Sequence, residues 1–345
     1  MAKNYKKVSC TIRKGERSMY DVVALGELLI DFIENGRSKQ GNPIFEANPG
    51  GAPCNVLAML KKLGYKTAFI GKVGEDAFGK MLWNVLVELE IDTSGLMYDR
   101  NIPTTLALVH NKLDGDREFS FYRNPGADLM LQEQEVPYDL IENCKIFHFG
   151  SLSMTANPAK TATKAAVEYA KKAGKIISFD PNLRESLWSN LDEAASAIWY
   201  GIEQCDILKI ADNEIRWLTG EDDIDKGVNI IKEKAEITLI NVTLGKEGSI
   251  SYYRNRKVFA EPFLSEHTID TTGAGDTFCG CILGDVLKYG LENLSNQRIK
   301  SMLLKANAAA SIVTTRKGAI YSMPEITEID NIMHGNRRDN KSKIQ

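Results

Sequence analysis

The chain has 345 residues, of which 26% are charged, and its formal net charge is −3. A chain of this length can bury a substantial core in one large domain or in two smaller ones. The near-neutral charge gives no electrostatic reason to expect binding to nucleic acid or to an anionic membrane surface, and no apolar run approaches the length of a membrane span. We therefore expect neither nucleic acid nor a membrane as a partner.

Residues 1–19 are expected to form an N-terminal extension, which is rich in Lys and Arg and lacks the apolar core of a secretory signal. The six cysteines contain no C-x-x-C pair, and the four histidines form no metal-binding pattern. We expect free thiols rather than disulfides or a structural zinc site, and a cytoplasmic location.

The segment Tyr20 to Ile30 is a near-continuous apolar run, which is typical of a buried parallel strand. Asp31 follows it directly, and ligands of open α/β sheets bind at the carboxyl ends of strands. The sequence therefore nominates Asp31 as a ligand contact, although a turn or cap role explains this residue equally well.

A glycine-containing segment, Asn48 to Asn55, precedes a helical repeat of apolar residues that ends at Gly64. Within it, Gly50 and Gly51 bring bare backbone close to the Asn55 side chain. Sugar hydroxyls require such a mixture of donors and acceptors. A tight loop in which Asn55 caps the helix is the alternative.

Two alternating segments, Thr104 to His110 and Arg117 to Arg123, are joined through Asp114 to Asp116, which predicts a β-hairpin. Because no helix separates them, we expect them to leave the main sheet. Together they predict a small, discontinuous β lid over about residues 31–49 and 103–124. A lid over the strand ends would exclude water from a reaction.

From residue 145 the sequence alternates regularly between strand and helix patterns. This alternation predicts an α/β fold over residues 20–330, with a mostly parallel sheet and helices on both faces. A polar C-terminal tail, 331–345, is expected to be frayed. The expected strands are 145–149, 176–179, 207–210 and 237–242, the expected helices are 159–173, 191–204, 213–219, 224–234 and 301–315, and 249–253 with 257–263 form an expected hairpin.

The segment Asp270 to Gly280 carries the strongest functional signal and opens a further helical pattern. Gly273 and Gly275 allow a sharp turn and let a ligand approach the backbone closely. The unpaired N–H groups of a starting helix, together with its dipole, favour an anion at this place. The segment therefore predicts a phosphate-binding turn.

Asp276 lies where these backbone donors converge. A carboxylate beside a developing phosphoryl charge would be repelled unless it had a role, and accepting a proton from an attacking hydroxyl is such a role. The pattern indicates phosphoryl transfer to an alcohol, with a simple helix N-cap as the other interpretation. The sequence contains neither a Walker A motif nor the protein-kinase signatures.

Between about residues 20 and 325 the chain resembles the ribokinase-like (PfkB) carbohydrate kinases, and within that family it is most similar to the fructokinases. Two separated motifs carry the resemblance, Gly50 to Ala58 and Asp270 to Gly280. The segments 71–79, 117–128 and 180–184, with Trp188, support it.

The resemblance implies a role for each matching residue. Asp276 would be the general base, and the amides of Gly273, Ala274 and Gly275 would stabilise the charge of the transition state. From the residues alone, the turn from Thr243 to Gly248 is equally well explained as a connection between two strands. The implied binding set is Asp31, Gly50, Gly51 and Asn55 for the sugar, with Arg123 and Arg184 as further substrate-side candidates; Lys209, Glu214, Thr243, Gly245, Gly248 and Asn307 for ATP and Mg²⁺; and Asp270, Thr272, Val313, Arg316, Gly318 and Ser322 for K⁺.

Two positions depart from patterns of the family. Ala52 replaces the Lys that ribokinases usually carry after the glycine pair, and Gly-Gly-Ala-Pro is similar to the fructokinases. Ala211 replaces the Asn of the family's Asn-x-x-Glu element, while Glu214 keeps its place. The first departure favours fructose as the substrate, and the second removes one amide from the expected magnesium and phosphate site.

The leading interpretation is an ATP-dependent kinase that converts D-fructose to fructose 6-phosphate, with Asp276 as the base and with Mg²⁺ and K⁺ as cofactors. Alternative acceptors are 2-keto-3-deoxygluconate, for which Arg123 is the candidate cation, and ribose or another riboside. A non-catalytic sugar sensor would not need Asp276, and a nicotinamide-dependent dehydrogenase would need a G-x-G-x-x-G motif that the first strand lacks. Unpaired strand edges in the lid also suggest a homodimer formed through the lid.

Overall fold

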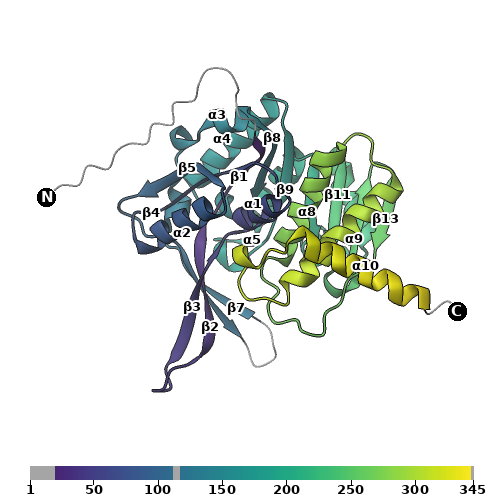
Figure 1. Cartoon of the computed structure of the whole chain (residues 1–345). Helices are drawn as coiled ribbons and strands as arrows, with labels where there is room; N and C mark the ends of the chain where they lie inside the picture. Colours follow the sequence, from purple (N-terminus) through teal and green to yellow (C-terminus); the bar gives the residue numbers. More distant parts are fainter. Residues whose placement is uncertain (1–19, 112–116, 343–345) are drawn as a thin grey trace, which may run out of the picture.

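A nine-stranded sheet runs through the computed structural model, which describes residues 20–111 and 117–342 (Figure 1). Neighbouring strands pair in parallel except at one edge, where a hairpin adds two antiparallel strands. The predicted α/β fold with a mostly parallel sheet is confirmed. In spatial order the strands are β13 (Arg256–Ala260), β12 (Ser249–Tyr253), β11 (Leu239–Thr243), β10 (Ile207–Ala211), β9 (Ile176–Asp180), β8 (Cys144–Gly150), β1 (Tyr20–Leu25), β4 (Thr67–Gly74) and β5 (Asp92–Asp99).

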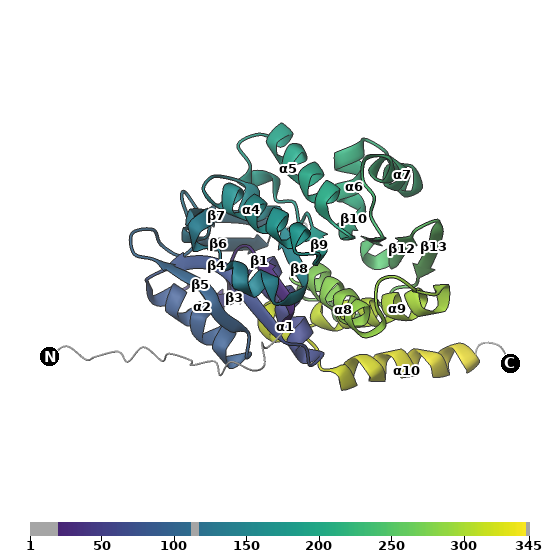
Figure 2. The ribbon, with the colours of Figure 1, turned by 90° about the horizontal axis from the view of Figure 1, so that it is seen from above.

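Helices cover both faces of this sheet (Figure 2). Alternate side chains of a strand point to opposite faces, so Val22 of β1 belongs to one apolar core and Val23 to the other. No helix among residues 20–111 and 117–342 is both long and apolar enough to span a membrane. One face carries α1 (Ala52–Lys62), α2 (Ala77–Glu88), α8 (Ala274–Tyr289), α9 (Asn296–Val313) and α10 (Ile326–Ser342), and the other carries α3 (Tyr138–Glu142), α4 (Ala159–Lys172), α5 (Leu191–Gln204), α6 (Asp212–Thr219) and α7 (Ile224–Lys234).

The predicted single strand Tyr20 to Ile30 is wrong, because the chain breaks at residues 26–28 and forms two strands. A side chain at Gly26 would place its Cβ 2.6 Å from Cγ of Pro53, so this position needs glycine where the start of α1 approaches. The second strand, β2 (Leu29–Arg37), leaves the main sheet. The break therefore directs the chain out of the main sheet and into the lid.

The lid is a four-stranded sheet in the order β3 (Pro43–Gly50), β2, β6 (Leu106–Asn111) and β7 (Arg117–Tyr122). It extends beyond one side of the main sheet (Figure 1). The pairing of β6 with β7 is antiparallel, which confirms the predicted hairpin. The expected turn at 114–116 and the expected N-terminal extension at 1–19 lie outside the described residues.

The C-terminal segment differs from the frayed tail expected from residue 331, because α10 continues to Ser342. Ile329 is fully buried, and Ile332 and Met333 pack against the same core. This apolar stripe stabilises a helix whose composition is otherwise polar.

Candidate active site

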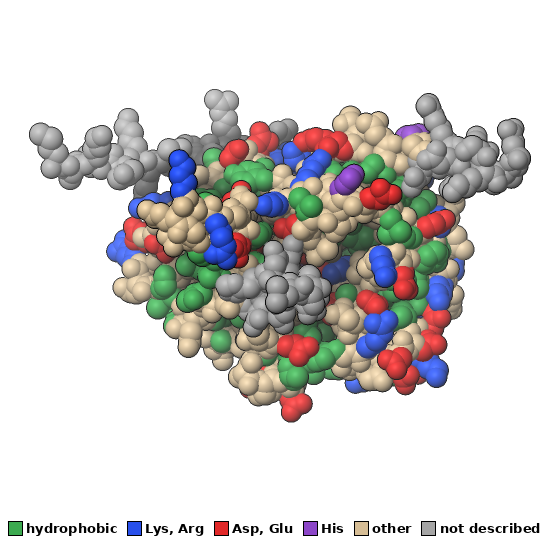
Figure 3. Space-filling view, turned by 90° about the horizontal axis from the view of Figure 1, so that it is seen from below, with side chains coloured by type: hydrophobic (Ala, Val, Ile, Leu, Met, Phe, Trp, Pro, Cys, Tyr) green, Lys and Arg blue, Asp and Glu red, His purple; other side chains and the backbone are tan. Residues whose placement is uncertain are grey.

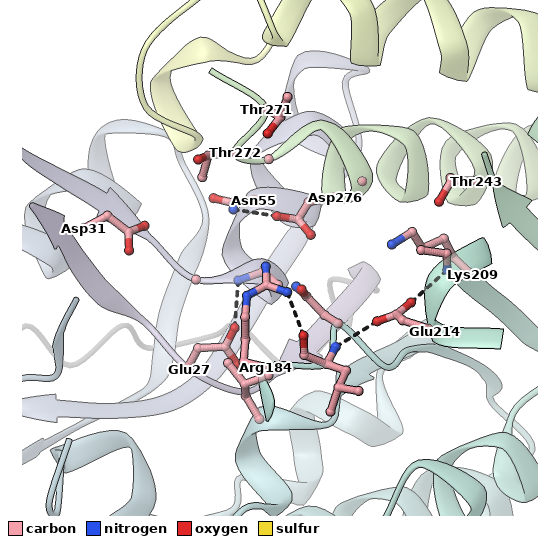
Figure 4. A pocket seen from close by; sticks show the side chains of 18 of the residues that line it. Glu27, Asp31, Asn55, Arg184, Lys209, Glu214, Thr243, Thr271, Thr272 and Asp276 are labelled. Carbon is pink, nitrogen blue, oxygen red and sulfur yellow. Dashed lines mark hydrogen bonds between the residues drawn. The ribbon is translucent and has the colours of Figure 1, made fainter. Parts of the chain in front are cut away.

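A cavity of about 890 Å³ lies between the lid and the carboxyl ends of the central strands. The molecule is hollowed near the centre of the face seen in Figure 3, and Figure 4 shows side chains that line the cavity. Segments far apart in the sequence meet here, as expected for the ligand site of an open α/β sheet. The predicted residues that line the cavity are Asp31, Gly51, Asn55, Arg184, Lys209, Glu214, Thr243, Asp270, Thr272, Gly273, Gly275 and Asp276.

The N-terminus of α8 forms one wall of the cavity. Gly273 directly precedes the helix with φ of 79°, a left-handed conformation that glycine adopts without strain. The Ala274 amide donates to the Thr271 carbonyl at 3.3 Å, whereas the Gly275 amide has no backbone acceptor among the described residues. A Cβ at position 275 would lie 3.0 Å from Nζ of Lys209. The helix end and this ammonium group therefore form a site suited to an anion.

Asp276 is 7% exposed, and its Oδ2 accepts a hydrogen bond of 2.7 Å from Nδ2 of Asn55 (Figure 4). Burial, followed by the charge of Asp180, raises the pKa of Asp276 to about 6. The Asn55 hydrogen bond and the charges of Lys209 and Arg184 act in the opposite direction. A carboxyl group with a pKa near neutrality is suited to accept a proton from a hydroxyl.

Asn55 lies in the first turn of α1, lines the cavity and contacts α8 directly through Asp276. Its Oδ1 is buried and has no hydrogen-bond partner among the described residues. Buried acceptors usually have a partner, so this oxygen is an exception among the described side chains. Asn55 thus holds the candidate base through its side-chain Nδ2, while its oxygen stays buried.

Lys209, in the middle of β10, places its ammonium group beside the start of α8. Its Nζ lies 3.1 Å from Oδ2 of Asp180. Burial lowers the pKa of Lys209, but the carboxylates of Asp180, Glu214 and Asp276 outweigh it and raise the pKa above its usual value. The ammonium group therefore stays charged and can hold a phosphate.

Glu214 joins the segment that follows β9 to the end of β10, and both line the cavity. Its carboxylate accepts hydrogen bonds from the amides of Leu183 and Ala211, each at 2.8 Å. Burial raises the pKa of this carboxyl, and the charge of Lys209 opposes that effect. Ala211, at the position of the missing family Asn, thus contributes its backbone amide to Glu214.

The glycine pair before α1 packs closely against the β1–β2 region. A Cβ at Gly50 would lie 2.3 Å from Oδ2 of Asp31, and a Cβ at Gly51 would lie 2.4 Å from the carbonyl oxygen of Glu27. Gly51 also has φ of 125°, which disfavours any other residue. The two glycines therefore let Asp31 and the start of α1 approach the same side of the cavity.

The remaining predicted residues do not line the cavity. Asn307, on α9, uses its amide to hold the β12–β13 hairpin: Oδ1 accepts from Oγ of Ser249 at 2.9 Å, and Nδ2 donates to the Glu261 carbonyl at 2.8 Å. The predicted residues outside the lining are Gly50, Arg123, Ala274, Gly245, Gly248, Asn307, Val313, Arg316, Gly318 and Ser322.

Arg123 was predicted to contact the substrate. It directly follows β7, the last strand of the lid, and its guanidinium contacts residues outside the lid. Its Nη2 lies 2.5 Å from Oδ2 of Asp128, and both side chains are almost fully buried. The guanidinium also donates to Oγ1 of Thr155 and to the carbonyl of Leu152, each at 3.0 Å. These contacts anchor the end of β7 beside the cavity.

The residues predicted to surround K⁺ gather beside the start of α8. Asp270 is 1% exposed, and its carboxylate accepts from the amides of Thr272 at 2.7 Å and Gly318 at 3.4 Å. The guanidinium of Arg316 donates to the Ser322 carbonyl at 3.1 Å. The segment 313–322 therefore contacts the buried Asp270 through the Gly318 amide, and the Thr314 carbonyl accepts from the Asp270 amide at 3.1 Å.

Glu27 and Asn182 are among the cavity residues that were not identified from the sequence. Glu27 lies in the break between β1 and β2, and the glycine before it is the signal that could have indicated this break. Asn182 lines the cavity after β9 with a positive φ of 43°. Its place after Asp180 and Pro181 at a strand end was the available signal.

The chain is similar to known carbohydrate kinases over most of its length. The chain matches the family model of the pfkB family carbohydrate kinases over residues 19–326. Fructokinase-1 of Zea mays is 41% identical over 310 residues, which cover 89% of this chain and 96% of that protein. The structure of the Xylella fastidiosa fructokinase with bound ATP superposes with a TM-score of 0.83 at 29% identity, covering 92% of this chain and 99% of the other.

A second solved structure is that of a fructokinase double mutant from Vibrio cholerae O395 in its fructose-, ADP- and potassium-bound form. It has a TM-score of 0.82 at 30% identity and covers 92% of this chain and 99% of the other. The resemblance inferred from the two sequence motifs is confirmed, and the chain belongs to the pfkB family of carbohydrate kinases.

Proposed function

We propose that this carbohydrate kinase transfers the γ-phosphoryl group of ATP to the primary hydroxyl of D-fructose, giving fructose 6-phosphate. The observation that carries the proposal is the position of Asp276, a buried carboxylate at the N-terminus of α8 that shares a cavity with Asn55 and Lys209. The similarity to named fructokinases over most of the chain supports fructose as the acceptor.

In this reaction Asp276 accepts the proton of the attacking hydroxyl. Its Oδ2 is held by Asn55, which leaves Oδ1 to face the hydroxyl. The amide of Gly275, the helix dipole and the ammonium of Lys209 stabilise the charge that develops on the transferred phosphoryl group. Asp31 and the turn at Gly50 and Gly51 hold the sugar on the opposite side of the cavity.

The nucleotide phosphates fit between Lys209 and the start of α8. The nucleoside then extends towards the end of β11, where Thr243 lines the cavity and Gly245 and Gly248 form the adjacent turn. Mg²⁺ usually retains several waters and is held by one or two carboxylates together with phosphates. Glu214 lines the cavity beside Lys209 and fits this role, in which the ion neutralises phosphate charge.

The buried carboxylate of Asp270 and the nearby backbone oxygens fit a monovalent cation, and the Vibrio relative was solved with potassium. We therefore propose activation by K⁺, which would order the turn before α8. Exchange of KCl for tetramethylammonium chloride at equal ionic strength should lower kcat. An unchanged kcat would reject this proposal.

An ADP-release assay over D-fructose, D-ribose, a riboside and 2-keto-3-deoxygluconate tests the proposed acceptor. We expect the highest kcat/KM with fructose. Arg123 was the candidate cation for the carboxylate of 2-keto-3-deoxygluconate. Its pairing with Asp128 therefore argues against this keto acid as the acceptor. Faster turnover of another sugar would replace fructose, and sugar-dependent stabilisation without ADP release would indicate a sensor.

We further propose a homodimer formed through the lid and a cytoplasmic location. The edge strands of the lid, β3 and β7, carry exposed Ile44 and Tyr122, which a second copy can cover. The described cysteines are free and buried, as is common where thiols stay reduced. Light scattering of the purified chain should give twice the monomer mass, and cell fractionation checks the location.

A further inference from the structure

Glu27 is a cavity residue to which the proposed reaction assigns no role. It lies in the break between β1 and β2 and is 3% exposed, yet it lines the cavity on the acceptor side (Figure 4). Burial raises the pKa of its carboxyl to about 7, and the charge of Asp128 acts in the same direction. Hydrogen bonds from backbone amides and the charge of Arg123 lower the pKa but do not outweigh burial. A buried carboxyl in this environment calls for a specific contact that retains it.

The contact that Glu27 makes is with the first residue of α1. Its Oε1 accepts a hydrogen bond of 2.8 Å from the amide of Ala52. The residue at the helix N-cap, Gly51, has no side chain, the first turn contains no acidic residue, and Pro53 has no N–H group. Glu27 therefore supplies, from another part of the chain, the acceptor that a capping side chain would normally provide.

The hydrogen bond between Glu27 and Ala52 lies beside the part of the cavity proposed to hold the acceptor sugar. The carbonyl of Glu27 approaches Gly51 so closely that a Cβ there would lie 2.4 Å away, and Gly26 and Pro53 approach each other in the same way. Asn55, in the first turn of α1, donates to Asp276. The orientation of α1 at Ala52 thus determines where Asn55 meets the candidate base.

We propose that Glu27 is a positioning residue for the acceptor sugar: through Ala52 it holds the glycine turn and the start of α1, and so fixes the place at which the sugar hydroxyl meets Asp276. The inference rests on the proposed function, because it requires an acceptor sugar on this side of the cavity. A purely structural helix cap would affect stability, whereas this role predicts weaker binding of the acceptor sugar with unchanged binding of the nucleotide.

Glu27→Ala and Glu27→Gln test this role by steady-state kinetics. Glu27→Ala should raise the KM for fructose by about tenfold or more and lower kcat, with the KM for ATP nearly unchanged, because the acceptor alone loses its orientation. Glu27→Gln should recover the fructose KM to within about threefold, since its amide oxygen still accepts from Ala52. Asp223→Ala is the matched control, because Asp223 caps α7 by accepting from the amides of Asp225 and Lys226. It should lower stability and leave both KM values unchanged.

An unchanged fructose KM in Glu27→Ala, or equal increases in the KM values for fructose and ATP, would overturn the inference. The thermal shift caused by fructose without ATP tests the positioning role of Glu27 independently of the proposed kinase activity. If wild type forms no ADP but gains thermal stability from a sugar, and Glu27→Ala loses that gain, the positioning role stands and the kinase proposal fails. A wild type with neither response overturns both.

Discussion

Asp276 is the residue whose ionisation is expected to limit the reaction at low pH. Burial and Asp180 raise its pKa to about 6, and the carboxylate is the form that accepts a proton. The value of kcat/KM should therefore rise with pH through about 6. Asn55→Ala removes the hydrogen bond that favours the carboxylate, so the midpoint should move upward by up to about one pH unit. A pH profile of kcat/KM checks this, and an unmoved midpoint would argue against a direct effect of Asn55.

Glu27 provides a titration that can be measured as stability. Its pKa rises from 4.5 to about 7 on folding, so the folded protein keeps a proton that the unfolded chain releases. Ionisation of Glu27 therefore lowers the free energy of unfolding as pH rises from about 4.5 to about 7. At 1.36 kcal/mol per pKa unit the loss is about 3 kcal/mol, and it persists above pH 7. Glu27→Gln cannot ionise. Its free energy of unfolding relative to wild type should be higher at pH 8 than at pH 5, which urea titrations at both pH values measure. The same difference at the two values would contradict the raised pKa.

At the scale of elements, the close approach of α1 and α8 sets the distance between Asn55 and Asp276. Gly280 allows this approach, because a Cβ there would lie 2.8 Å from Cβ of Met59 and 3.0 Å from the carbonyl oxygen of Val56. Both helices are packed into the same buried core. A side chain at this position must therefore push the two helices apart.

Gly280→Ala is predicted to lower both thermal stability and kcat. The cost of overpacking is about 1–3 kcal/mol, which exceeds the gain of roughly 0.5–1 kcal/mol from replacing glycine inside a helix. Gly335→Ala is the matched control, since Gly335 lies in α10 with nothing within 4 Å of the added Cβ, and this variant should be slightly stabilised. Thermal unfolding and steady-state assays of both variants check the prediction, and an unaffected Gly280→Ala would contradict the role of close helix packing.

The sequence was sufficient to predict most elements, because their apolar patterns have the periods of buried strands and amphipathic helices. The helix 191–204 agrees with α5 at both ends. The break at Gly26 was missed because three residues of irregular backbone between two apolar strands do not change the pattern. The continuation of α10 was missed because its stabilising contacts come from the core and not from its own polar composition.

At the scale of the whole molecule, the site forms where three distant segments meet at the carboxyl ends of the strands. Two motifs identified Asp276 and Asn55 as candidates, the family resemblance implied Lys209, and the cavity contains all three. The contacts between individual side chains could not be predicted from the sequence, because the partners are distant in the chain. The hydrogen bond between Asn55 and Asp276 joins residues 221 positions apart. Residues such as Arg123 and Asn307 have the right chemistry for a ligand, but their partners in the fold are other protein groups.

The most direct test of the kinase account is the steady-state kinetics of Asp276→Asn with fructose and ATP. The amide keeps the shape of the carboxyl and cannot take the hydroxyl proton, so kcat should fall by about 10²–10⁴ while the fructose KM stays near that of wild type. Asp285→Asn, on the same helix but paired with Lys305, should keep the wild-type kcat. If Asp276→Asn retains more than about a tenth of wild-type kcat, Asp276 is not the base and the account is contradicted.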